Sequence, residues 1–342
     1  MGAVLRRRNL AGLAGIILCG GVAAAVTTGG GPTVVAKDHG FTLTKTASGL
    51  LTNDAFTHRR SDRRLEDAFE FNGSGNTSYD YVRDAGHGLE VGQHAQDAPR
   101  FKGWFAVTLA AFPATSVFHV ELARTPGNVT GPGRESEAVF AVQTASTKVT
   151  GLINFVEVTS DSLRGSTAWQ IDYSHGRIRD ARSTLFWRSA QSTHAPLSHE
   201  VTVRTNGRNR LTVWFGNAVI FHSDRLRLDM EAPFQPYLEV QSLRAPYVSS
   251  FKDFWVTKDA ALTVTGLPGG ARVRLLAAGG GRPLASATAG RSGAARLALP
   301  PPEARGRARL FVSFPGGRHV VLGPFGYAGG DHYRLRAESR SA

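Results

Sequence analysis

The feature that most constrains this chain is a long succession of short apolar runs separated by turn residues. Fourteen such runs, each of five to twelve residues, lie between residues 67 and 257. No stretch of ten or more residues carries a convincing helical period. Strands that are this short, numerous and evenly spaced predict two packed antiparallel sheets. The missing crossover helices argue against a parallel α/β sheet.

A second, smaller unit is expected after residue 257. Six further strand-like runs follow within residues 258–328, separated by Gly- and Pro-rich turns such as PGG, GGGR and PPPEARG. This pattern predicts a small immunoglobulin-like β-sandwich, and the remaining residues 329–342 are predicted to be a polar tail. A chain of 342 residues with 42% apolar residues is long enough for one large and one small core.

The first 28 residues have the layout of an export signal. Arg6, Arg7 and Arg8 precede the apolar run Leu10 to Val26, which ends near the small residues Ala23 and Ala25. This layout is typical of a cleaved signal peptide, and a retained N-terminal membrane anchor is the alternative. Both place the rest of the chain outside the cytoplasm, so we expect an extracellular or cell-envelope protein.

Two further expectations concern the region after this leader. Residues 29–55 are rich in Gly, Thr and Ser and are predicted to be a flexible linker, so that the larger domain spans 56–257. The single cysteine, Cys19, lies within the leader. The rest of the chain can therefore form neither a disulfide nor a thiolate metal site.

Charge is concentrated in the last quarter of the chain. The whole sequence has 40 Lys and Arg against 27 Asp and Glu, and from Lys258 onward the count is 13 against 4. A basic exported region predicts an anionic neighbour, such as a cell-wall polymer, an acidic polysaccharide or lipid headgroups, although solubility alone is an alternative explanation. No nucleic-acid-binding motif is present, so we expect no nucleic-acid partner.

The stretch RLTVWFGNAVIFHS (210–223) predicts a β-hairpin around Gly216-Asn217. In a regular register Thr212 faces Phe221. One face would then be apolar and interior, while the other would carry Trp214 and Phe221. A second apolar face is explained by a neighbouring layer, by a covering loop or by a ligand.

This hairpin and the segments after it resemble a known family. The pattern "RLTVWFGNAVIFHS…APFQPYLEVQS…YVSSFKDFWV" resembles the closing strands of concanavalin A-like lectin/glucanase domains, which include laminin-G-like modules and family 16 glycosidases. The resemblance implies a two-sheet jelly-roll sandwich in which one sheet is curved and its concave face often holds sugar. The expected architecture is thus all-β, a concanavalin A-like sandwich followed by a smaller immunoglobulin-like one.

Sugar recognition usually combines aromatic rings, which stack on C–H groups, with polar side chains that bind hydroxyls. On this basis we predict eight ligand-binding candidates. They are Trp214, Phe221, Trp169, Tyr173, Trp187, Trp104, Asp172 and Arg188. Core packing is the alternative explanation for each aromatic residue, and a solvated strand face is the alternative for Asp172 and Arg188.

Catalytic signatures are weak. Retaining glycosidases of the resembled fold carry an E-x-D-x-x-E run, and the nearest approaches here are Glu157 with Asp161, and Glu66 and Asp67 with Glu70. Neither spacing matches. No metal-binding or phosphate-binding motif is present, so no cofactor is expected, although calcium often supports lectin-like sandwiches.

The leading hypothesis is an exported, non-catalytic protein that binds carbohydrate or another surface polymer. The first alternative is a glycoside hydrolase or polysaccharide lyase of the same fold with a divergent active site. The second is a structural envelope protein without a ligand.

Overall fold

A computed structural model describes most of the chain after residue 30. The described residues are 31–54, 69–71, 81–84, 88–93, 102–108, 110–124, 135–145, 155–163, 166–175, 182–191, 199–243, 247–280 and 282–338. Within them the protein consists of β-strands and one short 3-10 turn, η2 (Pro301–Glu303). No helix in this part of the chain is long and apolar enough to cross a membrane. The predicted leader, residues 1–28, lies outside the described residues.

The chain forms two compact units. The described residues of the larger unit fall within Asn53–Ala114 and Phe118–Phe254. Those of the smaller unit fall within Val26–Thr52, Thr115–Val117 and Trp255–Ala342. Each unit is described separately below.

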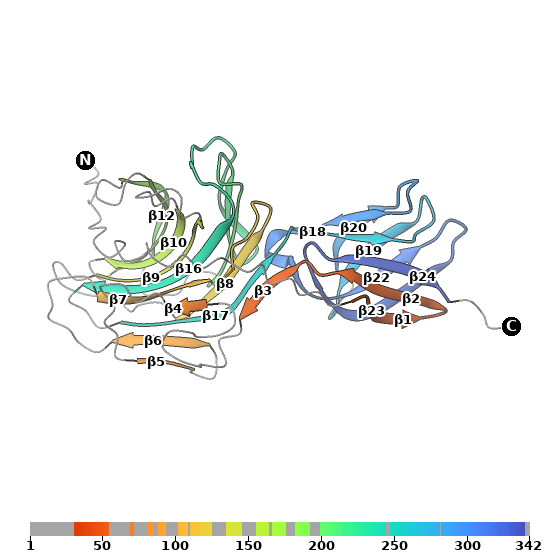
Figure 1. Ribbon diagram of the computed structural model, residues 1–342, viewed down its shortest axis with the longest axis horizontal. Helices are drawn as coiled ribbons and strands as arrows, with labels where there is room; N and C mark the ends of the chain where they lie inside the picture. Colours follow the sequence, from red (N-terminus) through yellow and green to blue (C-terminus); the bar gives the residue numbers. More distant parts are fainter. Residues whose placement is uncertain are drawn as a thin grey trace. The chain divides into compact units, whose positions relative to one another are not determined.

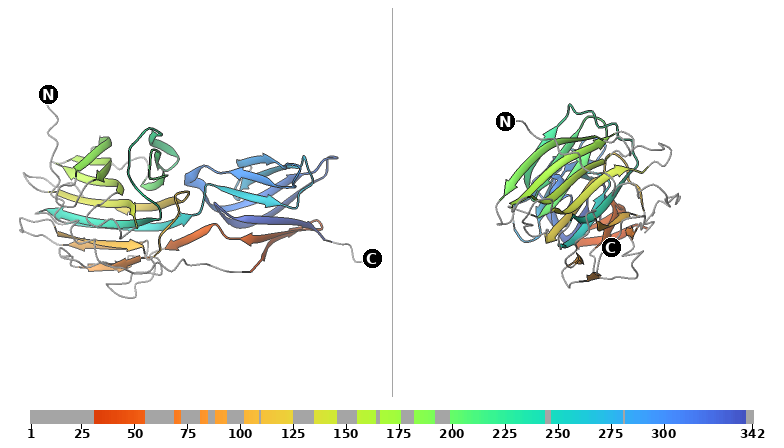
Figure 2. Two further views of the ribbon diagram at one scale, coloured as in Figure 1. Left: turned by 45° about the horizontal axis from the view of Figure 1, so that its top comes forward. Right: turned by 90° about the vertical axis from the view of Figure 1, so that its left-hand side faces the viewer.

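The first sheet of the larger unit has seven antiparallel strands, in the order β12-β11-β10-β9-β16-β7-β4 (Figure 1). Several of them are seen side by side in the right-hand view of Figure 2. Their bounds are β4 (Phe69–Phe71), β7 (Lys102–Thr108), β9 (Glu135–Thr144), β10 (Phe155–Leu163), β11 (Ser166–His175), β12 (Arg182–Gln191) and β16 (Phe234–Leu243).

The second sheet of the larger unit has the order β15-β14-β13-β8-β17-β6-β5, and β3 (Leu50–Asp54) pairs with β17 as an eighth strand. The bounds of the seven strands are β5 (Tyr81–Asp84), β6 (Leu89–Gln93), β8 (Val117–Arg124), β13 (Glu200–Thr205), β14 (Leu211–Phe215), β15 (Ala218–Ser223) and β17 (Tyr247–Thr257).

Aromatic side chains show that these two sheets pack face to face. Trp169 of β11 meets Phe215 of β14 at a centroid distance of 4.9 Å, and Phe140 of β9 meets Phe254 of β17 at 6.5 Å. Edge-to-face contacts of this kind stabilise a core beyond the area that they bury. Strands β4 to β17 coincide with the fourteen predicted runs, and the predicted two-sheet sandwich is confirmed.

The smaller unit is also a two-sheet sandwich. One sheet has the order β1-β2-β24-β18-β21 and the other the order β20-β19-β22-β23. Strand β24 pairs antiparallel with β2 and parallel with β18. The bounds are β1 (Thr33–Asp38), β2 (Phe41–Ala47), β18 (Ala261–Thr265), β19 (Arg272–Ala277), β20 (Pro283–Thr288), β21 (Ala295–Ala298), β22 (Arg305–Ser313), β23 (His319–Ala328) and β24 (His332–Ala337).

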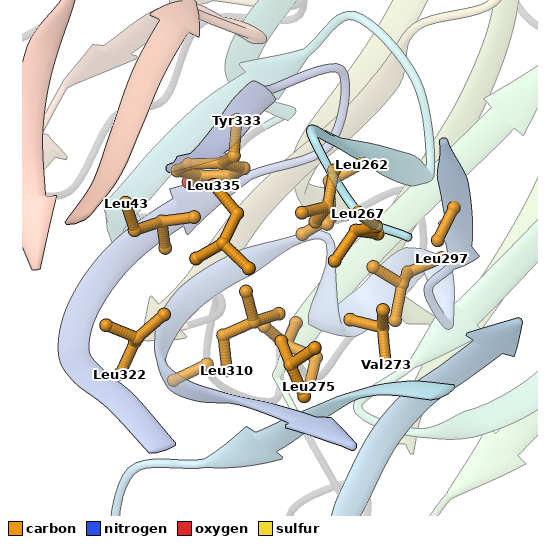
Figure 3. Close-up of a cluster of buried hydrophobic side chains, with 14 of the residues drawn as sticks. Leu43, Leu262, Leu267, Val273, Leu275, Leu297, Leu310, Leu322, Tyr333 and Leu335 are labelled. Atoms are coloured by element: carbon orange, nitrogen blue, oxygen red, sulfur yellow. The ribbon is translucent and has the colours of Figure 1, made fainter. Parts of the chain in front are cut away.

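The core of this unit consists mainly of aliphatic side chains that alternate with exposed residues along each strand. Val273 and Leu275 of β19 and Leu310 of β22 face Leu43 of β2 and Leu335 of β24, and all are buried (Figure 3). Alternating burial of this kind is the two-residue period of a half-buried strand. All six runs predicted within residues 258–328 are strands of this unit.

Two predictions about the ends of this unit are wrong. Residues 33–47 are not a flexible linker but the hairpin β1–β2, and residues 332–337 are not part of a polar tail but form β24. Strand β2 pairs with β24, with Leu43 opposite Leu335. Both strands have a clear two-residue alternation, but each can bury its apolar residues only against partners far away in sequence. The immunoglobulin-like topology itself stays a prediction.

Candidate functional site

The seven-stranded sheet has two faces of opposite character, and β11 shows the difference most clearly. Trp169, Ile171 and Tyr173 point toward the second sheet and are buried, as their alternation requires. The intervening residues have polar side chains. They are Gln170, Asp172 and Ser174, with exposed fractions of 4%, 3% and 1%. Polar residues that occupy the side away from the core and are still shielded from water need an explanation.

The strand register extends this polar character across the sheet, because directly opposite residues share a face. Phe155 of β10 lies opposite Ser174 of β11 on one side and opposite Gln143 of β9 on the other, so these three residues form one row across the strands. The row of Gln170 contains Arg188 on β12 and Glu239 on β16. We give the name polar face to six of the described polar side chains on this side. They are Gln143, Gln170, Asp172, Ser174, Arg188 and Glu239.

Hydrogen bonds hold part of the polar face in place. Arg188 Nη2 donates to Gln170 Oε1 at 3.1 Å, and the hydroxyls of Ser174 and Ser183 are 3.2 Å apart. A hydrogen bond from a charged donor is worth about 1.5–3 kcal/mol when partly buried. The long Arg188 side chain is thus fixed beside Gln170 instead of moving freely in solvent. Such fixed, convergent polar groups are characteristic of binding sites.

The edge strand β12 is the most accessible part of this face. Arg188 is exposed, and Leu185, which lies opposite Asp172, has 49% of its surface exposed. Farther across the sheet, Glu239 of β16 is half-buried. Val139 and Ala141 of β9, the strand next to β16 on the side of β12, are buried. A ligand that approaches along β12 would therefore meet the apolar side chain of Leu185 and the guanidinium group of Arg188 first.

Four of the predicted aromatic residues belong to the inner side of this sheet. Trp169 and Tyr173 are buried, at 0% and 3% exposure, so that their prediction as stacking residues is wrong. Trp187 is half-buried, lies opposite Ile171 and contacts Phe215 edge-on at 5.9 Å. Trp104 is opposite Val240, a core residue, and its side chain lies outside the described residues. Core packing accounts for Trp169, Tyr173 and Trp187.

Tyr173 belongs to an aromatic cluster at the edge where the two sheets meet. Its ring stacks on His175 at 5.4 Å and on Phe186 at 6.4 Å, and Phe186 in turn meets Phe221 of the other sheet at 5.4 Å. Burial, and to a lesser extent the charge of Asp229, raises the pKa of the Tyr173 hydroxyl above its ordinary value. The hydroxyl therefore stays neutral at any physiological pH.

The predicted hairpin forms, but its register differs from the regular one. Gly216 opens the turn with φ 54°, which a hairpin turn of the primed kind requires at that position. Beyond Trp214, which lies opposite Val219, the register shifts, so that Val213 lies opposite Phe221. This bulge turns Phe221 to the interior, where it contacts Phe186. The prediction that Phe221 shares a face with Trp214 is wrong.

Trp214 remains on the outer side of the eight-stranded sheet. It is half-buried between Thr202 on one side and Val219, which is 57% exposed, on the other. Trp214 is therefore on a different sheet from Asp172 and Arg188. Of the eight predicted residues, only Asp172 and Arg188 belong to the polar face.

Four polar-face residues were not among the predicted candidates. They are Gln143, Gln170, Ser174 and Glu239. The alternation of Gln170, Asp172 and Ser174 with apolar residues was a usable signal, because three successive polar positions on one side of a strand mark a face that is not core. Residues 143 and 239 join this face only through pairing with distant strands.

Carboxylates on this side need separate description because they bear on catalysis. In the backbone register Glu157 is directly opposite Asp172, and Glu239 lies on β16, three strands away from β11. Among the described residues there is no group of three or more His, Cys, Asp or Glu that could hold a metal ion.

Comparison with known proteins gives likeness only at the level of structure. No family model matches the sequence, and no curated protein matches it. Solved structures with a similar arrangement include the β-glucanase of Bacillus licheniformis (10% identity, covering 62% of this chain and 99% of that one, TM-score 0.41). Others are β-agarase A from Zobellia galactanivorans (7%, 65% and 94%, TM-score 0.45) and the carbohydrate recognition domain of Emp46p (8%, 60% and 95%, TM-score 0.40).

Proposed function

We propose that the larger unit binds a carbohydrate or a similar hydroxyl-rich surface polymer on the polar face, without cleaving it. The observation that carries this proposal is the set of Gln170, Asp172 and Ser174 along β11, which are polar and shielded from water and lie on the side of the strand away from the core. Amides and carboxylates are the groups that pair with the vicinal hydroxyls of a sugar. Arg188, held by Gln170, adds a charged donor at the accessible edge.

Asp172 and Glu239 are too far apart to form a catalytic pair of carboxylates. Asp172 and Glu239 are three strand spacings apart, which is roughly 14 Å at about 4.8 Å per spacing. Glycosidases place their two carboxyl groups about 5–5.5 Å apart when they retain configuration and about 6.5–9.5 Å apart when they invert it. These two side chains therefore cannot act together on one glycosidic bond.

Binding can be tested with the full chain on a glycan array, followed by calorimetric titration of each hit. Arg188→Ala is expected to weaken binding about tenfold, because it removes a charge-assisted hydrogen bond. Arg208→Ala is the matched control, since Arg208 is an exposed arginine away from the polar face. Equal affinity of the two variants for every hit, or no hit at all, would refute the proposal.

A glycoside hydrolase or lyase is the second candidate, and one specific observation favours it. Glu157 and Asp172 are direct register partners on adjacent strands, and such positions are one strand spacing, about 4.8 Å, apart. The test is release of reducing ends or unsaturated products from acidic and neutral polysaccharides. If the enzyme hypothesis holds, Asp172→Asn and Glu157→Gln each abolish turnover while binding persists. A wild-type chain that binds and releases nothing rejects it.

We also propose that the protein is exported, on the basis of the Arg-rich and apolar leader in residues 1–28. The mass of the mature chain from a secreting host checks this. Loss of the leader supports a cleaved signal, a full-length membrane-associated chain supports a retained anchor, and a full-length chain in the cytoplasm contradicts export.

A further inference from the structure

The outer surface of the four-stranded sheet in the smaller unit is unusually basic. Along β19 and β22, buried residues such as Val273 and Leu310 alternate with outward arginines. None of the four strands contains an Asp or a Glu. We call the outward cluster the arginine face. It consists of Arg272, Arg274, Arg307, Arg309, Phe311 and His319.

The register places these residues next to one another. Arg274 lies opposite Phe311, and Arg272 lies opposite Ser313, which in turn lies opposite His319. The guanidinium carbon of Arg274 is 4.4 Å from the centroid of the Phe311 ring, and the His319 ring stacks on Phe311 at 5.6 Å. A guanidinium held over a ring loses little further freedom when it binds a ligand.

The arginines of this face have no acidic partners among the described residues. Elsewhere in the unit Arg282 pairs with Glu303 and Arg296 with Asp259, but no ion pair involves Arg272, Arg274, Arg307 or Arg309. Residues two positions apart on a strand are separated by about 6.6–6.8 Å. The guanidinium groups of Arg272 and Arg274 on β19 therefore repel each other. An anion that bridges them would remove this repulsion.

We propose that the arginine face binds an acidic polysaccharide, a chain with a carboxylate or phosphate on its successive sugars. Guanidinium groups pair bidentately with such anions, and a row of them matches a repeating charge better than a single ion. The preference for a polysaccharide over other polyanions rests on the function proposed for the larger unit.

Two observations favour a polysaccharide over nucleic acid or a lipid surface. Single-stranded nucleic acid is usually bound by aromatic rings that stack on its bases, and the Phe311 ring is already covered by Arg274. A lipid surface favours inserted apolar side chains. Val321, which lies opposite Phe311 and is 36% exposed, is the one exposed large apolar side chain in the described part of this sheet.

The test measures binding of the full chain to polygalacturonate and to its fully methyl-esterified, uncharged form. The double substitution Arg272→Ser/Arg274→Ser is compared with Arg334→Ser/Arg336→Ser, which removes the same charge at the same spacing from exposed positions of β24. The first variant is expected to weaken binding to the charged polymer about tenfold and to reduce its salt dependence, and the second less than twofold. Phe311→Leu is expected to weaken binding severalfold with the fold retained.

Several results would overturn the proposal. One is an equal loss of affinity for polygalacturonate in the two double variants, and another is equal affinity for the charged and the esterified polymer. A third is tighter binding, at the same salt concentration, of vesicles rich in phosphatidylglycerol or of a single-stranded DNA oligomer than of polygalacturonate. Neutral-glycan binding by the polar face should survive Arg272→Ser/Arg274→Ser and be weakened by Arg188→Ala. The two proposals can therefore fail separately.

Discussion

The buried carboxylate of Asp331 is the point at which the N-terminal hairpin is fixed to the C-terminal strand of the smaller unit. Asp331 has no exposed surface. It accepts hydrogen bonds from the Gly49 amide at 2.7 Å, the Ala328 amide at 2.8 Å and the Tyr333 hydroxyl at 2.6 Å, and it pairs with Lys45 Nζ at 2.7 Å. Both of its oxygens are thus surrounded by donors.

Asp331→Asn is expected to be strongly destabilising although it preserves the shape of the side chain. In either orientation the new amide NH2 group meets a donor, and Lys45, whose side chain is 24% exposed, loses its counter-ion. Removing one partner of a buried ion pair costs about 3–5 kcal/mol. We expect the free energy of unfolding of the smaller unit to fall by an amount in this range.

Hydrogen exchange is the appropriate assay, because a chain of two units does not unfold in one step. The amide protons of Gly49 and Ala328 should lose protection in Asp331→Asn, and calorimetry should show one transition shifted to lower temperature. Glu338→Gln is the matched control. Glu338 also binds a lysine and a threonine, Lys37 and Thr42, but it is exposed, so little change is expected.

A double-mutant cycle sharpens this test. Lys45→Met leaves Asp331 as a buried charge without its counter-ion and should also destabilise the unit. The double variant Lys45→Met/Asp331→Asn should be less destabilised than the sum of the two single variants. Strict additivity, or an Asp331→Asn protein as stable as the wild type, would refute the reasoning.

Three further predictions concern other parts of the molecule. Gly49→Ala should prevent close docking of the hairpin, since an added Cβ would overlap the backbone carbonyl groups of Gly329 and Gly330, and proteolysis of the smaller unit should become faster. Val219→Ser should change the free energy of unfolding of the larger unit by no more than about 0.5 kcal/mol, because the side chain is 57% exposed; a larger loss in denaturant titration would show that it is covered. Burial, and to a lesser extent the charge of Glu303, raises the pKa of the Tyr327 hydroxyl to about 12. The stabilisation that this shift provides is complete below pH 10 and is lost between about pH 10 and 12. Tyr327→Phe should therefore flatten the dependence of unfolding free energy on pH in this range, and an unchanged dependence would contradict the assignment.

The sequence alone determined where most strands lie. Apolar alternation and turn residues act over a few positions, so the fourteen strands from β4 to β17 and the six from β18 to β23 were predicted from local pattern. The same local information gave the turn at Gly216. It also singled out Asp172 and Arg188, because each is a polar residue within an otherwise strand-like run.

Tertiary structure decided how these strands are used. Residues 41–47 and 332–337 became neighbouring strands of one sheet only because they pair with each other across almost the whole length of the chain, and residues 33–38 join this sheet by pairing with β2. A single shift in register turned Phe221 from the outer face to the core. Alternation shows that a strand such as β11 has two faces, but not which one meets the opposite sheet. That choice depends on which face buries more apolar surface against partners distant in sequence, and it placed Trp169 in the core and Asp172 on the polar face.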